Sequence, residues 1–301
     1  MDTSDDPFNW VCIRSAVDGK CIAEAGLVLT AVGIDNVIER DGDEWRLFTR
    51  QGHVALAEEQ LEDYRVENLP ANVRIPPIIT FDSGWTGVIG YLLVIWALPT
   101  LEASDAFGVA WRSAGWLEAG RVMEGEWWRT ITALTLHADL AHIVANSVFG
   151  AVFGLMAGRF LGSGLCWLLV LLGAALGNGL NAALQPHHFR SLGASTATFA
   201  ALGLFAAFVW RRGYFRGRGV RRSLAPIFAG IALLAFMGMG GTNTDILGHV
   251  AGFGCGLLLG ILIARFDIRR LGHSGQYLAG GAAMLLVVFA WTLAGQAYRS
   301  Q

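Results

Sequence analysis

The chain has 301 residues, a formal net charge of −2 and 15% charged residues, against about 25% in an average soluble domain, and its mean hydropathy is +0.48. This composition excludes a wholly soluble protein. The charges are unevenly divided, because residues 1–80 hold 15 acidic and 7 basic side chains, whereas residues 81–301 hold 9 acidic and 15 basic ones. We therefore expect an acidic soluble domain at residues 1–68, a proline-containing linker at residues 69–80 and a membrane part beyond it.

The N-terminal segment alternates between strand-like and helix-like patterns, which predicts a small ferredoxin-like α/β domain of βαββα order. It carries no motif of catalytic chemistry. We interpret it as a docking or regulatory module for an unidentified cytosolic partner. The expected elements are a strand at 9–16, a helix at 18–34, a hairpin at 36–49 with Asp41-Gly42 at its turn, and a helix at 53–66.

Seven apolar stretches follow, and most are long enough to cross a hydrocarbon core of about 30 Å at 1.5 Å per residue. They predict an all-α polytopic membrane protein behind the small N-terminal domain. The seven stretches lie near residues 84–100, 140–158, 163–184, 195–211, 224–240, 246–265 and 276–296.

Loop charges predict the orientation of these helices. The loop at residues 211–222 has six arginines and no acid, and Arg265, Arg269 and Arg270 follow the sixth helix. Both loops lie on one side of the membrane, and positive loops collect on the cytoplasmic side. We therefore expect a cytoplasmic N-terminus, in agreement with the five acidic residues and missing long apolar run of residues 1–25, which argue against a signal peptide. A nucleic-acid-binding role for the basic loop conflicts with its place between two spans.

The long loop at residues 101–128 then faces the outer side. It is rich in tryptophan, which settles at the level of the lipid headgroups. We expect this loop to lie partly in the membrane interface rather than in open water. The tryptophans of this region are Trp111, Trp116, Trp127 and Trp128.

The four cysteines and the adjacent pair His187 and His188 give no sign of a metal site. Four cysteines are scattered at positions 12, 21, 166 and 255, and none forms a C-x-x-C pair. We interpret them as buried free thiols rather than ligands or disulfides. His187 and His188 are interpreted as solvated loop residues, and no metal or cofactor is expected.

Four polar residues stand out in the apolar helices, where such side chains are costly and suggest function. Ser195 begins the fourth helix, His249 lies early in the sixth, and His142 and Asn146 begin the second. These three helices run in the same direction across the membrane, so the four side chains share one layer near the outer face. His142 and Asn146, spaced i and i+4, also share one helix face.

Small residues predict that the fourth and sixth helices touch. Gly252, Gly256 and Gly260 form a stripe that allows close helix packing, and Ala200 and Gly203 leave similar room. Contact between these helices would let the His249 imidazole reach the Ser195 hydroxyl and activate it as a nucleophile. His142, Asn146 and the Ser195 N–H would then supply donors to an oxyanion. A serine that merely packs in a helix contact is the alternative.

These residues resemble the rhomboid intramembrane serine proteases over about residues 81–270. In that family a G-x-S motif opens the fourth helix and a histidine on the sixth completes a serine–histidine dyad, as in Gly193-Ala194-Ser195 and His249. The family's H-x4-H-x3-N motif resembles His137, His142 and Asn146, and its W-R motif resembles Trp128-Arg129. The resemblance implies that Ser195 and His249 are catalytic, that His142 and Asn146 bind the oxyanion, and that the structural residues near the site are His137, Trp128, Arg129, Phe199, Gly193 and Gly252.

The chain departs from the family pattern in a few places. Thr196 stands where a small residue usually follows the serine, Phe199 keeps the ring of the usual tyrosine without its hydroxyl, and Gly248 replaces alanine. A helix and tail at residues 273–301 extend a six-helix core at residues 81–272. Thr196 puts the rate in doubt more than the identity of the protein.

The resemblance implies a serine endopeptidase that cleaves transmembrane segments near the outer face of the membrane. Its partners are transmembrane substrates and the lipid bilayer, with no nucleic acid. We expect a multi-pass protein of a bacterial inner or plasma membrane with its active site opening outward. A catalytically silent, client-binding relative is the alternative, and a small transporter is disfavoured because neither inverted repeats nor midplane charges are found.

Overall fold

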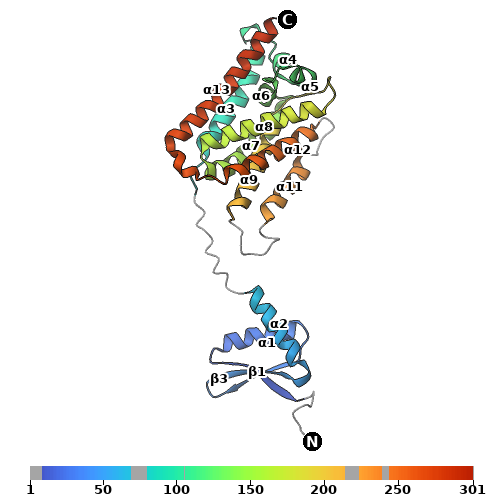
Figure 1. Ribbon diagram of the computed structural model, residues 1–301, viewed down its shortest axis with the longest axis vertical. Coiled ribbons are helices and arrows are strands. Elements are labelled where there is room, and N and C mark those ends of the chain that lie inside the picture. Colours follow the sequence, from blue (N-terminus) through green and yellow to red (C-terminus); the bar gives the residue numbers. More distant parts are fainter. Residues whose placement is uncertain (1–8, 69–79, 105, 214–223, 239–243, 301) are drawn as a thin grey trace. The chain divides into compact units, whose positions relative to one another are not determined.

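The structure is a computed structural model that describes residues 9–68, 80–104, 106–213, 224–238 and 244–300 (Figure 1). The chain divides into two compact units, Met1–Arg74 and Ile75–Gln301. Residues 69–79 of the predicted linker and 214–222 of the predicted basic loop lie outside the described residues.

The N-terminal unit is a three-stranded antiparallel sheet of order β1-β3-β2, packed against two helices. The predicted N-terminal sheet is therefore confirmed. Its core contains Ile22, Leu29, Leu47 and Leu61, because alternate strand residues and one face of each helix turn inward. The elements are β1 (Trp10–Ala16), α1 (Gly19–Ala31), β2 (Asn36–Asp41), β3 (Glu44–Arg50), η2 (Gln51–His53) and α2 (Val54–Glu67).

The hairpin turn lies one residue later than predicted. Asp41 and Glu44 pair as the last residues of β2 and β3, which leaves Gly42 and Asp43 as a two-residue loop. Gly42 has φ +64°, as the first central position of a type II′ turn requires. Another correction concerns the thiols of this unit, because Cys12 and Cys21 are exposed rather than buried.

The second unit is helical and apolar. Within the described residues, five stretches are long and apolar enough to cross a membrane. The helical polytopic fold is thus confirmed, whereas a count of seven spans stays a prediction. The five stretches are α3 (Trp85–Ala103), α7 (Leu140–Leu161), α8 (Ser163–Leu184), α12 (Ile246–Ile263) and Ile268–Arg299, which comprises η5 (Ile268–Leu271) and α13 (Gly272–Arg299).

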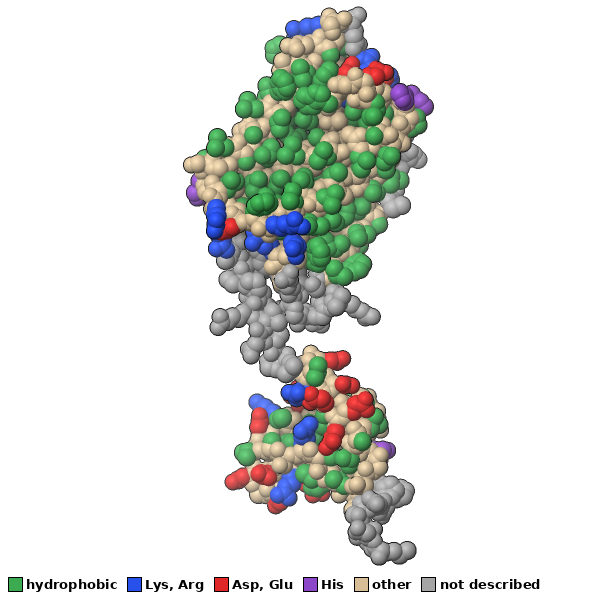
Figure 2. All heavy atoms as spheres, viewed as in Figure 1, with side chains coloured by type: hydrophobic (Ala, Val, Ile, Leu, Met, Phe, Trp, Pro, Cys, Tyr) green, Lys and Arg blue, Asp and Glu red, His purple; other side chains and the backbone are tan. Residues whose placement is uncertain are grey.

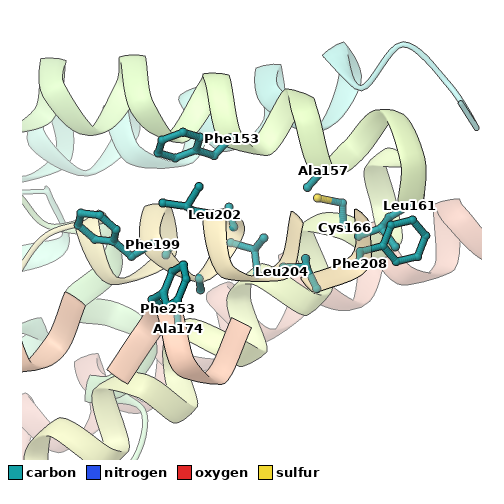
Figure 3. Close-up of a cluster of buried hydrophobic side chains, with 14 of the residues drawn as sticks. Phe153, Ala157, Leu161, Cys166, Ala174, Phe199, Leu202, Leu204, Phe208 and Phe253 are labelled. Carbon is teal, nitrogen blue, oxygen red and sulfur yellow. The ribbon is translucent and has the colours of Figure 1, made fainter. Parts of the chain in front are cut away.

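Two further helices occupy the remaining predicted stretches, α9 (Ser195–Arg212) and the shorter α11 (Ala225–Gly238). The helix α9 is buried along most of its length, in a cluster with residues of α7, α8 and α12. Figure 3 shows this cluster, with Phe153 of α7 on one side of α9 and Phe253 of α12 on the other. On the face that Figure 2 shows, hydrophobic side chains are spread over the middle of the unit and charged side chains gather toward its ends.

The loop between α3 and α7 contains several short elements that the sequence reading did not predict. One of them is a two-residue strand that pairs with a strand just before α9, Leu117 with Ser191 and Glu118 with Arg190. These elements are η3 (Ala106–Gly108), α4 (Trp111–Gly115), β4 (Leu117–Glu118), α5 (Ala119–Met123), α6 (Arg129–Thr132), η4 (Ala133–Thr135) and the partner strand β5 (Arg190–Ser191).

Candidate functional site

Ser195 is the first residue of α9 and is half-buried. The backbone before it is fixed by two hydrogen bonds. The Gly193 N–H donates to the Ala133 carbonyl (2.9 Å), and the Ala194 N–H donates to Nε2 of His137 (3.5 Å). Ser195 therefore stands on a segment that η4 and His137 hold in place, at a helix N-terminus with its unpaired N–H groups.

Gly193 lies directly against two side chains of α7. Its φ of +134° favours glycine, and a Cβ there would lie 2.5 Å from Cε1 of His142 and 3.7 Å from Nδ2 of Asn146. A side chain at position 193 would therefore meet both steric and conformational strain. The two polar residues of α7 and the segment before Ser195 thus form one cluster.

The Asn146 side chain is buried, and its Nδ2 has no hydrogen-bond partner among the described residues. Its backbone carbonyl is occupied by the Tyr91 hydroxyl, at 2.8 Å. Leaving a buried donor unpaired costs about 1–3 kcal/mol, and such exceptions call for an explanation. A donor beside Gly193 is free to bind a ligand oxygen.

His249 lies in the first turn of α12 and is buried. Its ring centroid is 4.7 Å from that of Phe199, which lies one turn after Ser195 on α9. The first turn is capped by Asp245, whose carboxylate accepts from the Gly248 N–H (2.9 Å) and from the Asn181 amide of α8 (2.7 Å). The structure therefore holds the imidazole between an aromatic ring of α9 and a helix start tied to α8.

Glycines of α12 show how closely it approaches α9. A Cβ on Gly252 would lie 2.5 Å from the carbonyl oxygen of Thr196, and one on Gly260 would lie 2.5 Å from that of Leu204. Between them, a Cβ on Gly256 would collide with the Ala200 carbonyl. Because the paired residue numbers rise together, the two helices run parallel. One turn before Gly252, His249 lies level with the start of α9.

The helix α8 lies on another side of this glycine stripe. A Cβ on Gly177 would meet the Gly252 backbone at 2.8 Å, and Gly173 faces Gly256. Since these pairs run in opposite directions, α8 is antiparallel to α12. The glycines thus allow α12 to pack tightly against two helices at once.

Thr196 directs its methyl group toward α12. A Cβ on Gly252 would lie 2.8 Å from the Thr196 Cγ2, and Thr196 is buried. The extra bulk of this β-branched side chain is therefore accommodated where Gly252 has no side chain.

Arg129 organises the loop that precedes the site. Its buried guanidinium pairs with Glu126 and donates to the carbonyls of Ser113 (3.1 Å) and Trp116 (2.9 Å). Trp128 packs edge to face on Trp127. Trp128 and Arg129 therefore both contact other residues of the loop between α3 and α7.

Glu118 joins this loop to the segment before Ser195. Its side chain pairs with Arg190 (3.3 Å) and lies near Arg121. Burial raises the pKa of Glu118, but the hydrogen bond and charge of Arg190 outweigh it, and the net pKa lies below its ordinary value. The carboxylate therefore stays charged and holds β4 and β5 together.

His137 is buried next to His142, with ring centroids 5.3 Å apart. Burial, together with the neighbouring imidazole of His142, lowers the pKa of His137 to about 3. A neutral ring can accept through Nε2, in agreement with the contact from the Ala194 N–H. Within the described residues, no group of three or more metal-ligating side chains is found.

Comparisons with known proteins agree with one another. A family model described as the rhomboid domain matches residues 124–266, which include all four polar residues of the site but neither the N-terminal unit nor α13. The putative rhomboid protease YdcA of Bacillus subtilis is 29% identical over 207 residues, covering 68% of this chain and 98% of that protein. The rhomboid protease GluP of the same organism is 29% identical over 175 residues, which cover 58% of this chain and 32% of GluP. Rhomboid-like protease 3 of Toxoplasma gondii is 33% identical over 135 residues, covering 44% of this chain and 50% of that protein.

Proposed function

This chain belongs to the rhomboid family, and from that premise we propose that it is an intramembrane serine endopeptidase with Ser195 as nucleophile and His249 as general base. It is an integral multi-pass membrane protein. Relatives named as rhomboid proteases support the protease function. The level placement of His249 and the start of α9 supports the dyad.

In the proposed reaction, the Ser195 Oγ attacks the carbonyl carbon of the scissile peptide bond while His249 takes the hydroxyl proton. The tetrahedral intermediate collapses as the C–N bond breaks and His249 returns the proton to the leaving amine. Water then hydrolyses the acyl-serine ester with the same base and releases the carboxyl product. Phe199 and the capped first turn of α12 keep the imidazole in position.

The observation that carries this proposal is the unpaired, buried amide of Asn146 beside the segment that leads to Ser195. An amide in this place can donate to the oxyanion of the tetrahedral intermediate. His142 on the same helix face and the Ser195 N–H add two further donors. Loss of one such donor costs about 2.7–4 kcal/mol in the transition state of a serine protease.

The proposed substrates are transmembrane segments of other membrane proteins, cleaved near the outer face. A helical peptide bond must unwind before a nucleophile reaches its carbonyl, and glycine or proline lowers that cost by about 1–3 kcal/mol per residue. The starts of α7, α9 and α12 bear the site, and the arginines of the predicted loops favour an outward direction for these ends. On this orientation the acidic N-terminal domain is a cytosolic docking module.

Cleavage of a single-span substrate in proteoliposomes tests the proposal. We expect Ser195→Ala and His249→Ala each to abolish cleavage while thermal unfolding of the purified proteins stays near that of the wild type. Unchanged cleavage by either folded variant contradicts the assigned role. Thr196 is the one departure from the family pattern that favours the catalytically silent alternative, and the packing of its methyl group on Gly252 weakens it as a support.

A further inference from the structure

A groove of about 550 Å³ runs along the membrane unit between α3, α8 and α13. Its volume lies within the range of about 300–1,000 Å³ that is usual for small-molecule sites. The walls α3 and α13 both pack on α8 and make few contacts with each other. The groove therefore has α8 as its floor and two membrane-spanning helices as its sides.

The groove is apolar along most of its length. Gly90 of α3 and Gly281 of α13 line it, and a Cβ on either would meet no atom within 4 Å. These glycines keep the groove open rather than permitting a close helix contact. The larger apolar side chains of its lining are Val94, Ile95, Trp167, Leu171, Met284 and Val287.

One end of the groove reaches the candidate active site. Leu134 and Thr135 of η4 line it there, together with Ala194 and Ala197, which flank Ser195 in the chain. The wall behind the proposed nucleophile is thus also a wall of the groove.

The opposite end is polar, but most of its polar groups already have partners. Asp82 accepts from the N–H groups of Gly84 (2.5 Å) and Ser163 (3.1 Å). Gln276 donates to the Leu161 carbonyl (2.8 Å) and accepts from a backbone N–H of α8 (2.9 Å). The Asp82 carboxylate and the Gln276 amide therefore already have hydrogen-bond partners at the helix ends.

Basic residues lie next to this polar end in the chain. His273 lines it and is exposed. Arg269 precedes α13 and is exposed, and the backbone of Arg159 is adjacent because its carbonyl accepts from the Phe81 N–H (2.5 Å). Figure 2 shows several Lys or Arg side chains, with an acidic one beside them, at the lower end of the membrane unit. An anionic headgroup suits this end better than a cationic one.

We propose that the groove binds one acyl chain of a phospholipid from the surrounding bilayer, with the phosphate near His273 and the chain reaching toward Ala194 and Ala197. From His273 to Val287, α13 rises about 21 Å at 1.5 Å per residue. One leaflet of a hydrocarbon core measures about 15 Å, so the groove accommodates a whole chain. Since lipid tails are as apolar as the helices, binding comes from packing on three sides and from headgroup charge.

Photocrosslinking of the full-length protein in nanodiscs tests this proposal, with phosphatidylglycerol that carries a diazirine on one acyl chain. In the wild type we expect crosslinks at Ala283 and Met284, which line the groove, to exceed those at Leu278 and Leu285, which are exposed on α13 and do not line it. Equal crosslinking of both sides contradicts a specific groove site. A label that enters only as a free fatty acid also overturns the proposal.

Variants sharpen the test. Gly281→Leu and Gly90→Leu place a side chain in the groove, and each should lower groove crosslinking at least about fivefold by steric exclusion. Gly295→Leu is the matched control, because a Cβ there also meets open space on α13 but position 295 does not line the groove. Wild-type crosslinking in both groove variants, or an equal loss in the control, contradicts the proposal.

Crosslinking does not require proteolysis, so Ser195→Ala should be labelled like the wild type. An inactive wild-type chain with normal labelling would refute the proposed protease and leave the lipid site standing. An active protease whose crosslinks show no preference for the groove would refute the lipid site and leave the proposed protease standing.

Discussion

The contact between α9 and α12 and the groove between α3, α8 and α13 use glycine in opposite ways. At Gly252, Gly256 and Gly260, a Cβ would collide with carbonyl oxygens of α9, whereas at Gly90 and Gly281 it would meet nothing within 4 Å. The first arrangement fixes the relative position of two helices. The second leaves a space that surrounding molecules can fill. A glycine in a membrane helix is therefore not by itself a sign of close packing, because the position of the neighbouring helix decides whether it allows a contact or leaves a space.

The two regions also differ in how precisely their helices must be placed. The proposed dyad depends on α12 lying close against α9, since the imidazole and the hydroxyl come from different helices. The walls of the groove carry no proposed catalytic group, although the groove ends behind Ser195. We expect substitutions in the contact between α9 and α12 to lower the stability of the folded protein. Substitutions in the groove should instead change the binding of surrounding lipid.

The largest expected effect comes from Gly256→Leu. Its side chain meets the Ala200 carbonyl, so we expect the free energy of unfolding to fall by about 3 kcal/mol or more, at the upper end of overpacking costs. Gly254→Leu on the same helix and Gly281→Leu in the groove meet open space, and each should change it by less than about 1 kcal/mol. Reversible unfolding in mixed micelles measures all three. Equal losses would erase the distinction between the two regions.

Asn146→Ala is expected to lower turnover by about 10–1,000-fold, because one of several proposed oxyanion donors is lost. The substitution also removes a buried donor that has no partner among the described residues, so the folded protein should lose little stability from it. Steady-state cleavage of a single-span substrate gives kcat and KM separately. A turnover within error of the wild type would leave Asn146 a structural part only.

His137 predicts a smaller, pH-dependent effect. Burial lowers its pKa to about 3, whereas an unfolded histidine titrates near 6.5. Because the unfolded state binds this proton first, the stability from a neutral His137 is present above about pH 6.5 and is lost as the pH falls toward 3. Between pH 7.5 and 5.5 the loss is about 1.4 kcal/mol.

Comparing the wild type with His137→Gln isolates this contribution. The variant should lose less unfolding free energy than the wild type between pH 7.5 and 5.5, whatever its stability at the higher pH. Identical pH slopes in the two proteins would show that His137 is protonated in the folded state or exposed to water.

The membrane helices could be predicted closely from the sequence, because long apolar runs have few alternative structures in a membrane. The range 163–184 matches α8, while α13 begins at Gly272, four residues before its predicted start. The residues before position 276 include the polar His273 and Ser274, so the apolar pattern does not extend back to Gly272. The partners of Gln276 are backbone groups of the α7–α8 turn, which no periodicity reveals.

The four polar residues of the site could be proposed from their shared layer and from the family resemblance. The contacts that hold the loop and the segment before Ser195 in place could not be predicted from the sequence. The pairing of Glu118 with Arg190 joins residues far apart in the sequence through strands of two residues. Such strands are too short for an alternating pattern to appear. The exposed Cys12 and Cys21 likewise depend on which strand and helix faces the N-terminal core covers.

The most direct test of the central claim is labelling of the membrane-embedded protein with a fluorophosphonate, which reacts with a serine that a neighbouring base activates. We expect one label on Ser195, found by peptide mapping, that disappears in Ser195→Ala and in His249→Ala and persists in Gly295→Leu. A label that persists in a folded His249→Ala variant, or no label on Ser195 in any lipid, would contradict the pairing of these two side chains.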